Sequence, residues 1–162
     1  MRIRVCWVGK TQNAPIKSLV SDYLGRLSHL VPIETVEVPD LSKRRSLRGA
    51  PLLAAEGEEF ARALTPDCRK VVLDERGTQF SSPEFARWLE AAQVRGTKEI
   101  AFIIGGPDGV DGALLEQAHL RLSLGKMTWT HEMARVLLLE QIYRALSILR
   151  NIPYHKQASG RR

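Results

Sequence analysis

The segment from Leu122 to Lys156 constrains the fold of this chain more than any other part of its sequence. It begins as a glycine-containing loop, continues as a long apolar stretch and reaches Asn151 and Pro153, a pattern that predicts one helix between two breaks. Thr130 is placed to cap this helix, with Glu132 in its first turn. Apolar residues occupy almost every face, so one amphipathic stripe cannot account for them. We therefore expect a helix buried on both sides, either as a central core helix or with its second face in a subunit interface.

Short apolar segments recur along the rest of the chain and predict strands. Residues 2–8 alternate with period two, which places one set of side chains on each face of a strand. Continuous apolar runs in the middle of the chain are typical of strands covered on both faces. Besides residues 2–8, the predicted strands are IETVEV from Ile33, KVVLDE from Lys70, EIAFII from Glu99 and LRLSL from Leu120.

Segments with apolar residues at helical spacing separate these strands. Strands that alternate with helices predict an α/β fold with a mostly parallel sheet and helices on both faces. A chain of 162 residues, 44% of them hydrophobic, suits one domain spanning residues 1–162. The predicted helices run from about Asn13, from Pro51 to about Leu64, from Pro83 with Ser82 as the cap, and from about Gly112 to Ala118.

Several classes of protein do not fit the sequence. Cys6 and Cys68 lack metal-ligand spacing and are expected to be small buried hydrophobes rather than a disulfide pair, which suits a reducing cytoplasm. The four histidines show no paired ligand spacing, so we expect no metal. The N-terminus lacks the apolar core of a signal peptide, and Glu140 and Arg144 interrupt the most apolar segment. We expect a cytoplasmic protein that does not span a membrane.

The formal net charge is +6, and the positive charges gather in two places. Because a guanidinium group matches a pair of phosphate oxygens, two clusters with several arginines suggest contacts to phosphates. A solvated loop and a frayed tail explain the same charges equally well. The clusters are Lys43, Arg44, Arg45 and Arg48 in one loop, and Arg144, Arg150, Lys156, Arg161 and Arg162 beyond the last acidic residue.

The carboxyl ends of three predicted strands are candidate binding positions, because ligands of open parallel sheets gather there. They are the ends at Leu73, at Gly105 and Gly106, and at residues 124–128. Glycine would let a ligand approach the backbone and would expose N–H donors. Neither GxGxxG nor GxxxxGK[ST] occurs, so the sequence supports no dinucleotide fingerprint and no P-loop. Read alone, GGPDG is more typical of a tight turn after a strand than of a binding site.

The C-terminal tail is a further candidate, because it holds polar groups with little to pack against. His155 lies between Tyr154 and Lys156 and follows Pro153. A disordered tail is the alternative. His131, at the start of the long helix, is expected to orient the preceding loop by hydrogen bonding rather than to titrate in a reaction.

These segments together resemble the ribosomal RNA large subunit methyltransferase H family of the SPOUT superfamily. The resemblance covers nearly the whole chain and implies an α/β fold with a C-terminal trefoil knot, and a homodimer. Thr130 stands where the family usually has proline, Trp129 where phenylalanine is common, and QASGRR extends the tail. The segments that carry the resemblance are VLDERG from Val72, FSSPEFA from Phe80, IIGGPDG from Ile103, LSLGKMTWTHEMARVLLLEQIYRA from Leu122 and PYHK from Pro153.

The resemblance implies methyl transfer from S-adenosylmethionine to N3 of a pseudouridine in 23S rRNA, on assembled ribosomes. The cofactor would be held largely by backbone groups, which explains the missing Rossmann fingerprint. A non-catalytic protein that binds RNA or the ribosome is the alternative function. Carried over by position, the cofactor residues are Leu73, Gly105, Gly106, Leu124, Gly125, Lys126, Met127, Thr128 and Trp129.

Catalysis of this reaction requires a group that removes the N3 proton or stabilises the anion that develops. His155 is the first candidate for the base, Tyr154 would position or polarise it, and Arg135 would offer positive charge. In a dimer, the tail would complete the site of the partner subunit. The residues expected to contact RNA are Lys43, Arg44, Arg45, Arg48, Arg144 and Lys156.

Overall fold

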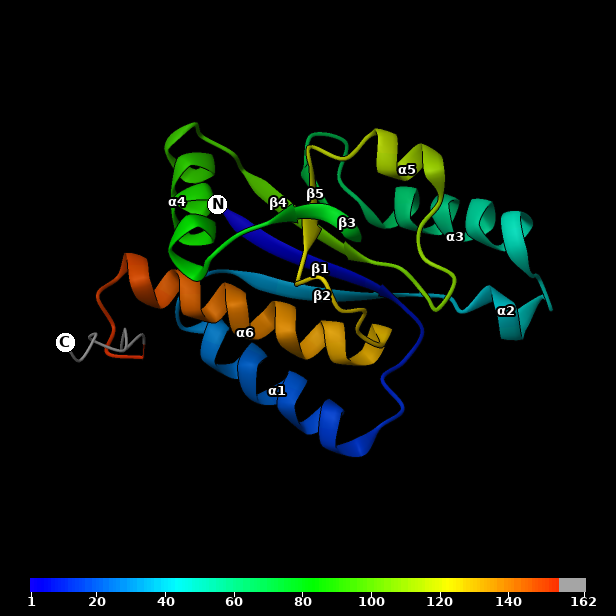
Figure 1. The fold of residues 1–162 in the computed structure, drawn as a ribbon, viewed down its shortest axis with the longest axis horizontal. Helices are drawn as coiled ribbons and strands as arrows, with labels where there is room; N and C mark the ends of the chain where they lie inside the picture. The colour runs from blue at the N-terminus through cyan, green and yellow to red at the C-terminus, as the bar shows by residue number, and fades with distance from the viewer. Residues whose placement is uncertain (155–162) are drawn as a thin grey trace.

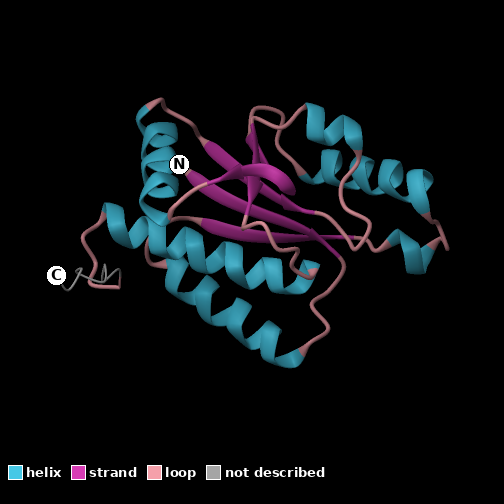
Figure 2. Cartoon of the chain, viewed as in Figure 1, coloured by secondary structure: helices cyan, strands magenta, loops and turns pink. Residues whose placement is uncertain are grey.

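The computed structural model describes residues 1–154 and contains a parallel sheet with helices on both faces (Figure 1, Figure 2). All paired strands run parallel, in the spatial order β2-β1-β4-β3-β5. The predicted α/β fold is confirmed. The strands are β1 (Arg2–Val8), β2 (Ile33–Val38), β3 (Arg69–Gln79), β4 (Glu99–Ile104) and β5 (Leu120–Ser123).

The helices form one layer on each face of the sheet (Figure 1). Side chains of α1, α4 and α6 pack in one apolar cluster with β1 and β4. Side chains of α3 and α5 form a second cluster on the opposite face, which contains Cys6. Both cysteines are buried and free. The helices are α1 (Ala14–Ser28), α2 (Leu41–Arg44), α3 (Gly49–Ala63), α4 (Ser82–Val94), α5 (Gly112–Glu116) and α6 (His131–Leu149).

Helix α6 lies between α1 and α4 against the sheet. Leu138, Leu139 and Ile142 on its inner side have no exposed surface, and no residue of the helix is fully exposed. Its two flanks are therefore covered within a single chain, so the structure supports the core-helix interpretation of this apolar segment. As predicted, Thr130 is the N-cap, and its hydroxyl accepts a hydrogen bond from the Met133 N–H.

The first turns of α6 also hold the loop between β1 and α1. The Glu132 carboxylate accepts hydrogen bonds from the backbone N–H groups of Gln12 (2.6 Å) and Asn13 (3.1 Å). These bonds hold the start of α1 beside the start of α6. The carboxyl end of β1 and the loop before α6 consequently share one edge of the sheet.

Three local predictions were wrong. The strand KVVLDE was expected to end at Glu75, but β3 continues through Gln79 after a bulge between Leu73 and Thr78, because this part pairs with β5. The cap of α4 is Ser81 rather than Ser82: its hydroxyl accepts from the Glu84 N–H, and the Glu84 carboxylate accepts from the Ser81 N–H, which completes a capping box. A short helix, α2, begins in the basic loop because Asp40 caps its N-terminus.

Candidate functional site

The bulge of β3 and the carboxyl ends of β4 and β5 surround a cavity of about 740 Å³. The first turns of α6 form a further wall. This is the edge of the sheet at which the sequence predicts a binding site. The lining residues are Leu73–Arg76, Ile104–Val110, Leu115, Arg121, Leu122, Leu124, Gly125, Met127–His131 and Ala134.

The structure brings together residues that are distant in sequence but were expected to bind the cofactor. Leu73, Gly105, Gly106 and residues 124–129 all line the cavity, except Lys126. The three strand ends singled out in the sequence therefore meet at one place.

Close backbone packing explains the glycines on this edge. A Cβ atom on Gly105 would overlap the carbonyl of Gly109, and one on Gly77 would lie 2.6 Å from the backbone of Arg121. The N–H of Gly109 donates to the Gly106 carbonyl (3.0 Å), so the GGPDG segment is indeed a tight turn. The turn and the binding-site interpretation are compatible, because the turn itself forms one wall of the cavity.

The loop from Leu124 to Thr130 is held at both of its ends. The Ser123 hydroxyl donates to the Gly125 carbonyl (2.9 Å), and Thr130 caps α6. Between them, the Thr128 hydroxyl donates to the Glu75 carboxylate in the bulge of β3 (2.8 Å). Glu75 was not predicted as a site residue, although the DERG run directly after a buried strand was a usable signal.

Acidic side chains stand around the cavity. Asp74, Glu75 and Asp108 line it, and Glu56 on α3 lies behind the glycine turn, 5% exposed. A Cβ on Gly106 would be 3.5 Å from the Glu56 carboxylate. Burial, together with nearby Asp40 and Asp108, raises the pKa of Glu56 to about 7. Sequence reasoning missed Glu56 because nothing in a helical pattern shows that a glutamate will face a loop of the sheet.

His131 lines the cavity and lies at the first position of α6. Burial lowers its pKa, and the positive charge of Arg135 lowers it further. The imidazole is therefore neutral at physiological pH and able to accept a hydrogen bond or a proton.

Arg135 does not line the cavity, although it was expected to offer charge to the substrate. Its side chain is 1% exposed, and its guanidinium donates to the Val8 carbonyl (2.7 Å) and the Thr11 hydroxyl (2.7 Å). The same group lies over the ring of Trp7, 5.0 Å from the ring centroid. In this structure Arg135 joins α6 to the end of β1.

Tyr154 lies against the outer side of α6, where its hydroxyl donates to the Glu140 carboxylate (3.1 Å). Glu140 is six residues beyond Ala134, the last cavity residue on the helix. At 1.5 Å and 100° per residue, that separation is roughly 9 Å along α6 and about 240° around it. Tyr154 is thus on a different side of α6 from the cavity of its own chain. His155 and Lys156 lie outside the described residues.

The basic loop is exposed at the same edge of the sheet. Lys43 and Arg44 end α2, Arg45 is its C-cap, and Arg48 is the N-cap of α3. All four side chains are exposed. Arg144 differs, because its guanidinium forms an ion pair with Glu140 at 2.6 Å.

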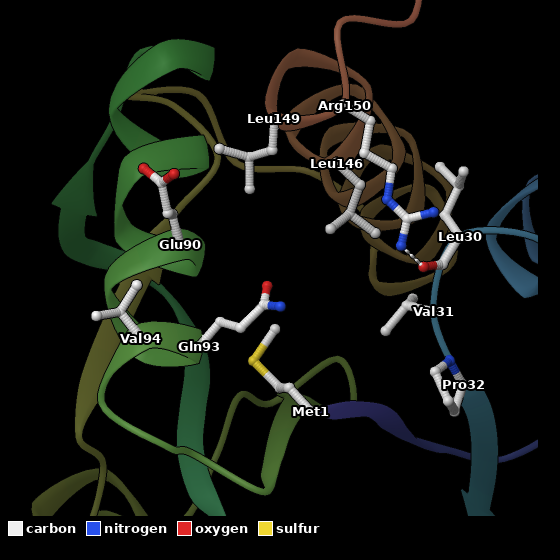
Figure 3. A pocket seen from close by; sticks show the side chains of 10 residues that line it. All are labelled: Met1, Leu30, Val31, Pro32, Glu90, Gln93, Val94, Leu146, Leu149 and Arg150. Atoms are coloured by element: carbon white, nitrogen blue, oxygen red, sulfur yellow. Dashed lines mark hydrogen bonds between the residues drawn. The ribbon is translucent and has the colours of Figure 1, made fainter.

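A second cavity, of about 610 Å³, lies at the amino ends of β1 and β2, beside the last turns of α4 and α6 (Figure 3). Its walls are mainly apolar side chains, among them Val31, Leu146 and Leu149. Arg150 at its rim donates to the Leu30 carbonyl. This second cavity contains no glycine turn and lies at the opposite edge of the sheet from the carboxyl strand ends that carry polar groups.

Comparisons with known proteins show the family of this chain. A family model described as "Predicted SPOUT methyltransferase" matches residues 1–155. The ribosomal RNA large subunit methyltransferase H of Geotalea daltonii is 42% identical, with 96% of this chain and 99% of that protein covered. The same-named protein of Parabacteroides distasonis is 38% identical, with 97% and 100% covered. This chain belongs to the ribosomal RNA large subunit methyltransferase H family.

A solved structure shares the fold of this SPOUT family member. A probable methyltransferase from Bordetella pertussis Tohama I superposes with a TM-score of 0.55 and 16% identity, and covers 90% of this chain and 96% of its own. At that identity the likeness concerns the fold alone. Within residues 1–154, no cluster of three metal-ligating side chains and no helix able to cross a membrane is present.

The raised pKa of Glu56 predicts how the free energy of unfolding depends on pH. The pKa of its carboxyl is higher in the folded chain than the ordinary value of 4.5, so the folded state is stabilised by proton binding at low pH and loses that contribution as pH rises through about 7. Glu56→Gln should raise the free energy of unfolding at pH 8 by on the order of 1–3 kcal/mol and leave it nearly unchanged at pH 4.5. Urea denaturation at both values measures this. Glu58→Gln, exposed on the same helix, is the control, and parallel pH profiles for Glu56→Gln and wild type would contradict the prediction.

Proposed function

We propose that this protein transfers a methyl group from S-adenosylmethionine to N3 of a pseudouridine in 23S rRNA on assembled ribosomes. The observation that carries the proposal is the glycine-walled cavity at the meeting point of β3, β4 and β5, in a chain of the ribosomal RNA large subunit methyltransferase H family. With it we propose the properties that the resemblance implies: a C-terminal trefoil knot, a homodimer and a cytoplasmic location.

The residues around the cavity fit this cofactor. A volume of about 740 Å³ lies within the range of small-molecule sites. The closely packed Gly105 turn and the loop from Leu124 to Trp129 present backbone groups, and a side chain at Gly105 would fill space that the Gly109 carbonyl occupies. Acidic Asp74, Glu75 and Asp108 suit a ligand whose sulfonium and amino groups are positively charged. When bound, the cofactor supplies an electrophilic methyl group.

The chain itself must align the nucleobase and remove a proton, because N3 of a uracil-type ring is protonated at neutral pH. We propose His155 as the proton acceptor and Tyr154 as the group that positions it. His131 lines the cavity, burial lowers its pKa, and we propose that it orients the loop after β5. We propose that Arg135 holds the start of α6 at the end of β1 rather than contacting the substrate, because both of its terminal nitrogens already donate to Val8 and Thr11.

We propose that the tail of each subunit acts in the cavity of its partner. Tyr154 is held by Glu140 on a side of α6 turned away from the cavity of the same chain. A homodimer would bring the tail of one chain to the other cavity. The exposed side chains of Met127 (75%) and Trp129 (42%) at the cavity support this, because a partner subunit or substrate would cover them.

The exposed basic loop is proposed to bind rRNA phosphates. Lys43, Arg44, Arg45 and Arg48 are exposed on α2 and at the start of α3, which follow the carboxyl end of β2 at the same edge of the sheet as the cavity. We propose that the loop holds RNA there while a nucleotide enters the cavity. A protein that only binds RNA would need this loop but not a glycine-walled cavity.

The first test of the function is calorimetric titration with S-adenosylmethionine, followed by methyl transfer to purified ribosomes. We expect one binding site per chain and one methyl group per ribosome, mapped by mass spectrometry to N3 of a pseudouridine in 23S rRNA. Cofactor binding without transfer to any ribosome or rRNA would reject the proposed reaction. Transfer to another nucleotide would reject the target but keep the enzyme class.

His155→Ala should lower the rate of methyl transfer about 10²- to 10⁴-fold, because general base catalysis contributes that much. The dissociation constant for S-adenosylmethionine and the dimer mass should stay unchanged. Single-turnover kinetics with ribosomes measures the rate. His29→Ala, an exposed histidine at the C-cap of α1, is the control. A variant as fast as wild type would remove His155 as the base.

Replacing Arg44 and Arg45 together by alanine should weaken binding to ribosomes and flatten its salt dependence. Each phosphate contact contributes about 0.7–0.9 to the slope of log K against log salt, so the slope should decrease by about 1.5. Filter binding between low and moderate salt measures it. Arg62→Ala serves as the control, because Arg62 is exposed on α3 but paired with Glu58 and Glu59. An unchanged slope would make the basic loop a solvated surface only.

A further inference from the structure

The last described residue of the chain, Tyr154, is held in a socket formed by α1 and α6. Its ring packs edge-on against Tyr143, with centroids 4.8 Å apart and planes at 72°. Arg144 lies over the same ring, 5.0 Å from its centroid. Its hydroxyl is 3.1 Å from the Glu140 carboxylate and 3.3 Å from the Tyr23 hydroxyl. The socket is therefore Tyr23, Glu140, Tyr143 and Arg144, and none of these residues lines the cavity.

Glu140 is the centre of the socket. One of its oxygens accepts from the Nε (3.0 Å) and a terminal nitrogen (2.6 Å) of Arg144 as well as from Tyr154. The other oxygen accepts from the Gln141 side chain (2.6 Å). The Glu140 side chain is only 17% exposed, so these bonds are poorly screened by water. The carboxylate orients Arg144 over the ring and binds the hydroxyl of the same tyrosine.

The chain between α6 and Tyr154 is also fixed. Asn151 adopts a left-handed conformation (φ 54°), which ends the helix and reverses the chain. The Ile152 N–H then donates to the Ser147 carbonyl (2.9 Å), and the Tyr154 N–H donates to the Ile152 carbonyl (2.7 Å). Backbone and side chain thus both define where the tail begins.

Tyr154 acts as a hydrogen-bond donor in this socket. Burial raises the pKa of its hydroxyl, and the hydrogen bond with Tyr23 and the charge of Glu140 raise it further. The phenol stays protonated at physiological pH, so it suits an anchor better than a proton acceptor. Arg144 is equally committed, since its charge is paired with Glu140 rather than free for a phosphate.

We propose that Glu140 is a positioning residue for methyl transfer: by holding Tyr154 in the socket, it fixes the point and direction from which the tail leaves α6. The inference rests on the proposed function, because it gives the tail a role in the reaction. His155 follows Tyr154 directly in the sequence, so the position of Tyr154 sets where the segment that carries His155 begins.

The test compares Glu140→Ala, Tyr154→Phe and the double variant with wild type. We expect each single variant to reduce the single-turnover rate on ribosomes about 10- to 100-fold, because small misplacements of a reacting group have effects of this size. The double variant should be no slower than the slower single variant, since both break the same contact. The dissociation constant for S-adenosylmethionine and the thermal midpoint should remain near the wild-type values.

Two further measurements separate positioning from a merely structural role. Glu58→Ala removes the acid of another Glu–Arg pair at the same helical spacing, on α3, and should leave the rate unchanged. Glu140→Gln keeps a side-chain oxygen that can accept from the Tyr154 hydroxyl but removes the ion pair with Arg144, and it should recover most of the rate that Glu140→Ala loses.

Wild-type rates in Glu140→Ala and Tyr154→Phe would overturn the inference and leave the proposed function standing. Loss of cofactor affinity or of several degrees in thermal midpoint, in step with the rate, would also overturn it, because Glu140 would then only stabilise the fold. If the wild-type protein binds S-adenosylmethionine but methylates no ribosome, the proposed function fails first, and the inference fails with it.

Discussion

The structure depends on one buried guanidinium group. Arg135 is almost completely enclosed, and a charge in that position is stable only if it is well bonded. Its two terminal nitrogens donate at the end of β1, to the Val8 carbonyl and the Thr11 hydroxyl, and the guanidinium lies over the face of Trp7. Because Arg135 lies in the second turn of α6, these contacts place the start of that helix at the carboxyl edge of the sheet. The loop before the helix is thereby held along the cavity.

Backbone packing then gives the cavity its shape. The bulge of β3 turns Asp74, Glu75 and Arg76 toward the cavity, and the strand afterwards pairs again with β5. That return requires Gly77, where a side chain would meet the backbone of β5. Gly105 has the same requirement on the opposite wall. A site built in this way needs no helix N-terminus for its ligand, which is consistent with a chain that has neither a Rossmann fingerprint nor a P-loop.

Sequence reasoning located the strands and the three strand ends because burial imposes a regular pattern on them. Residues 99–104 are all buried, and a continuous apolar run is what such a strand must have. The same reasoning missed the last part of β3, since RGTQ has the composition of a turn and is a strand only through its pairing with β5. Glu56, Glu75 and Glu140 were missed for a related reason: each is an ordinary helical or loop acid until a distant residue is brought beside it.

Charged side chains of both signs surround the functional edge of the protein. Asp74, Glu75 and Asp108 line the cavity together with Arg76 and Arg121, whereas the exposed arginines of residues 43–48 lie beside it. Under the proposed function, the carboxylates of the cavity would face the positive groups of the cofactor and the basic loop would face the phosphates of the RNA, so the two ligands would occupy different positions.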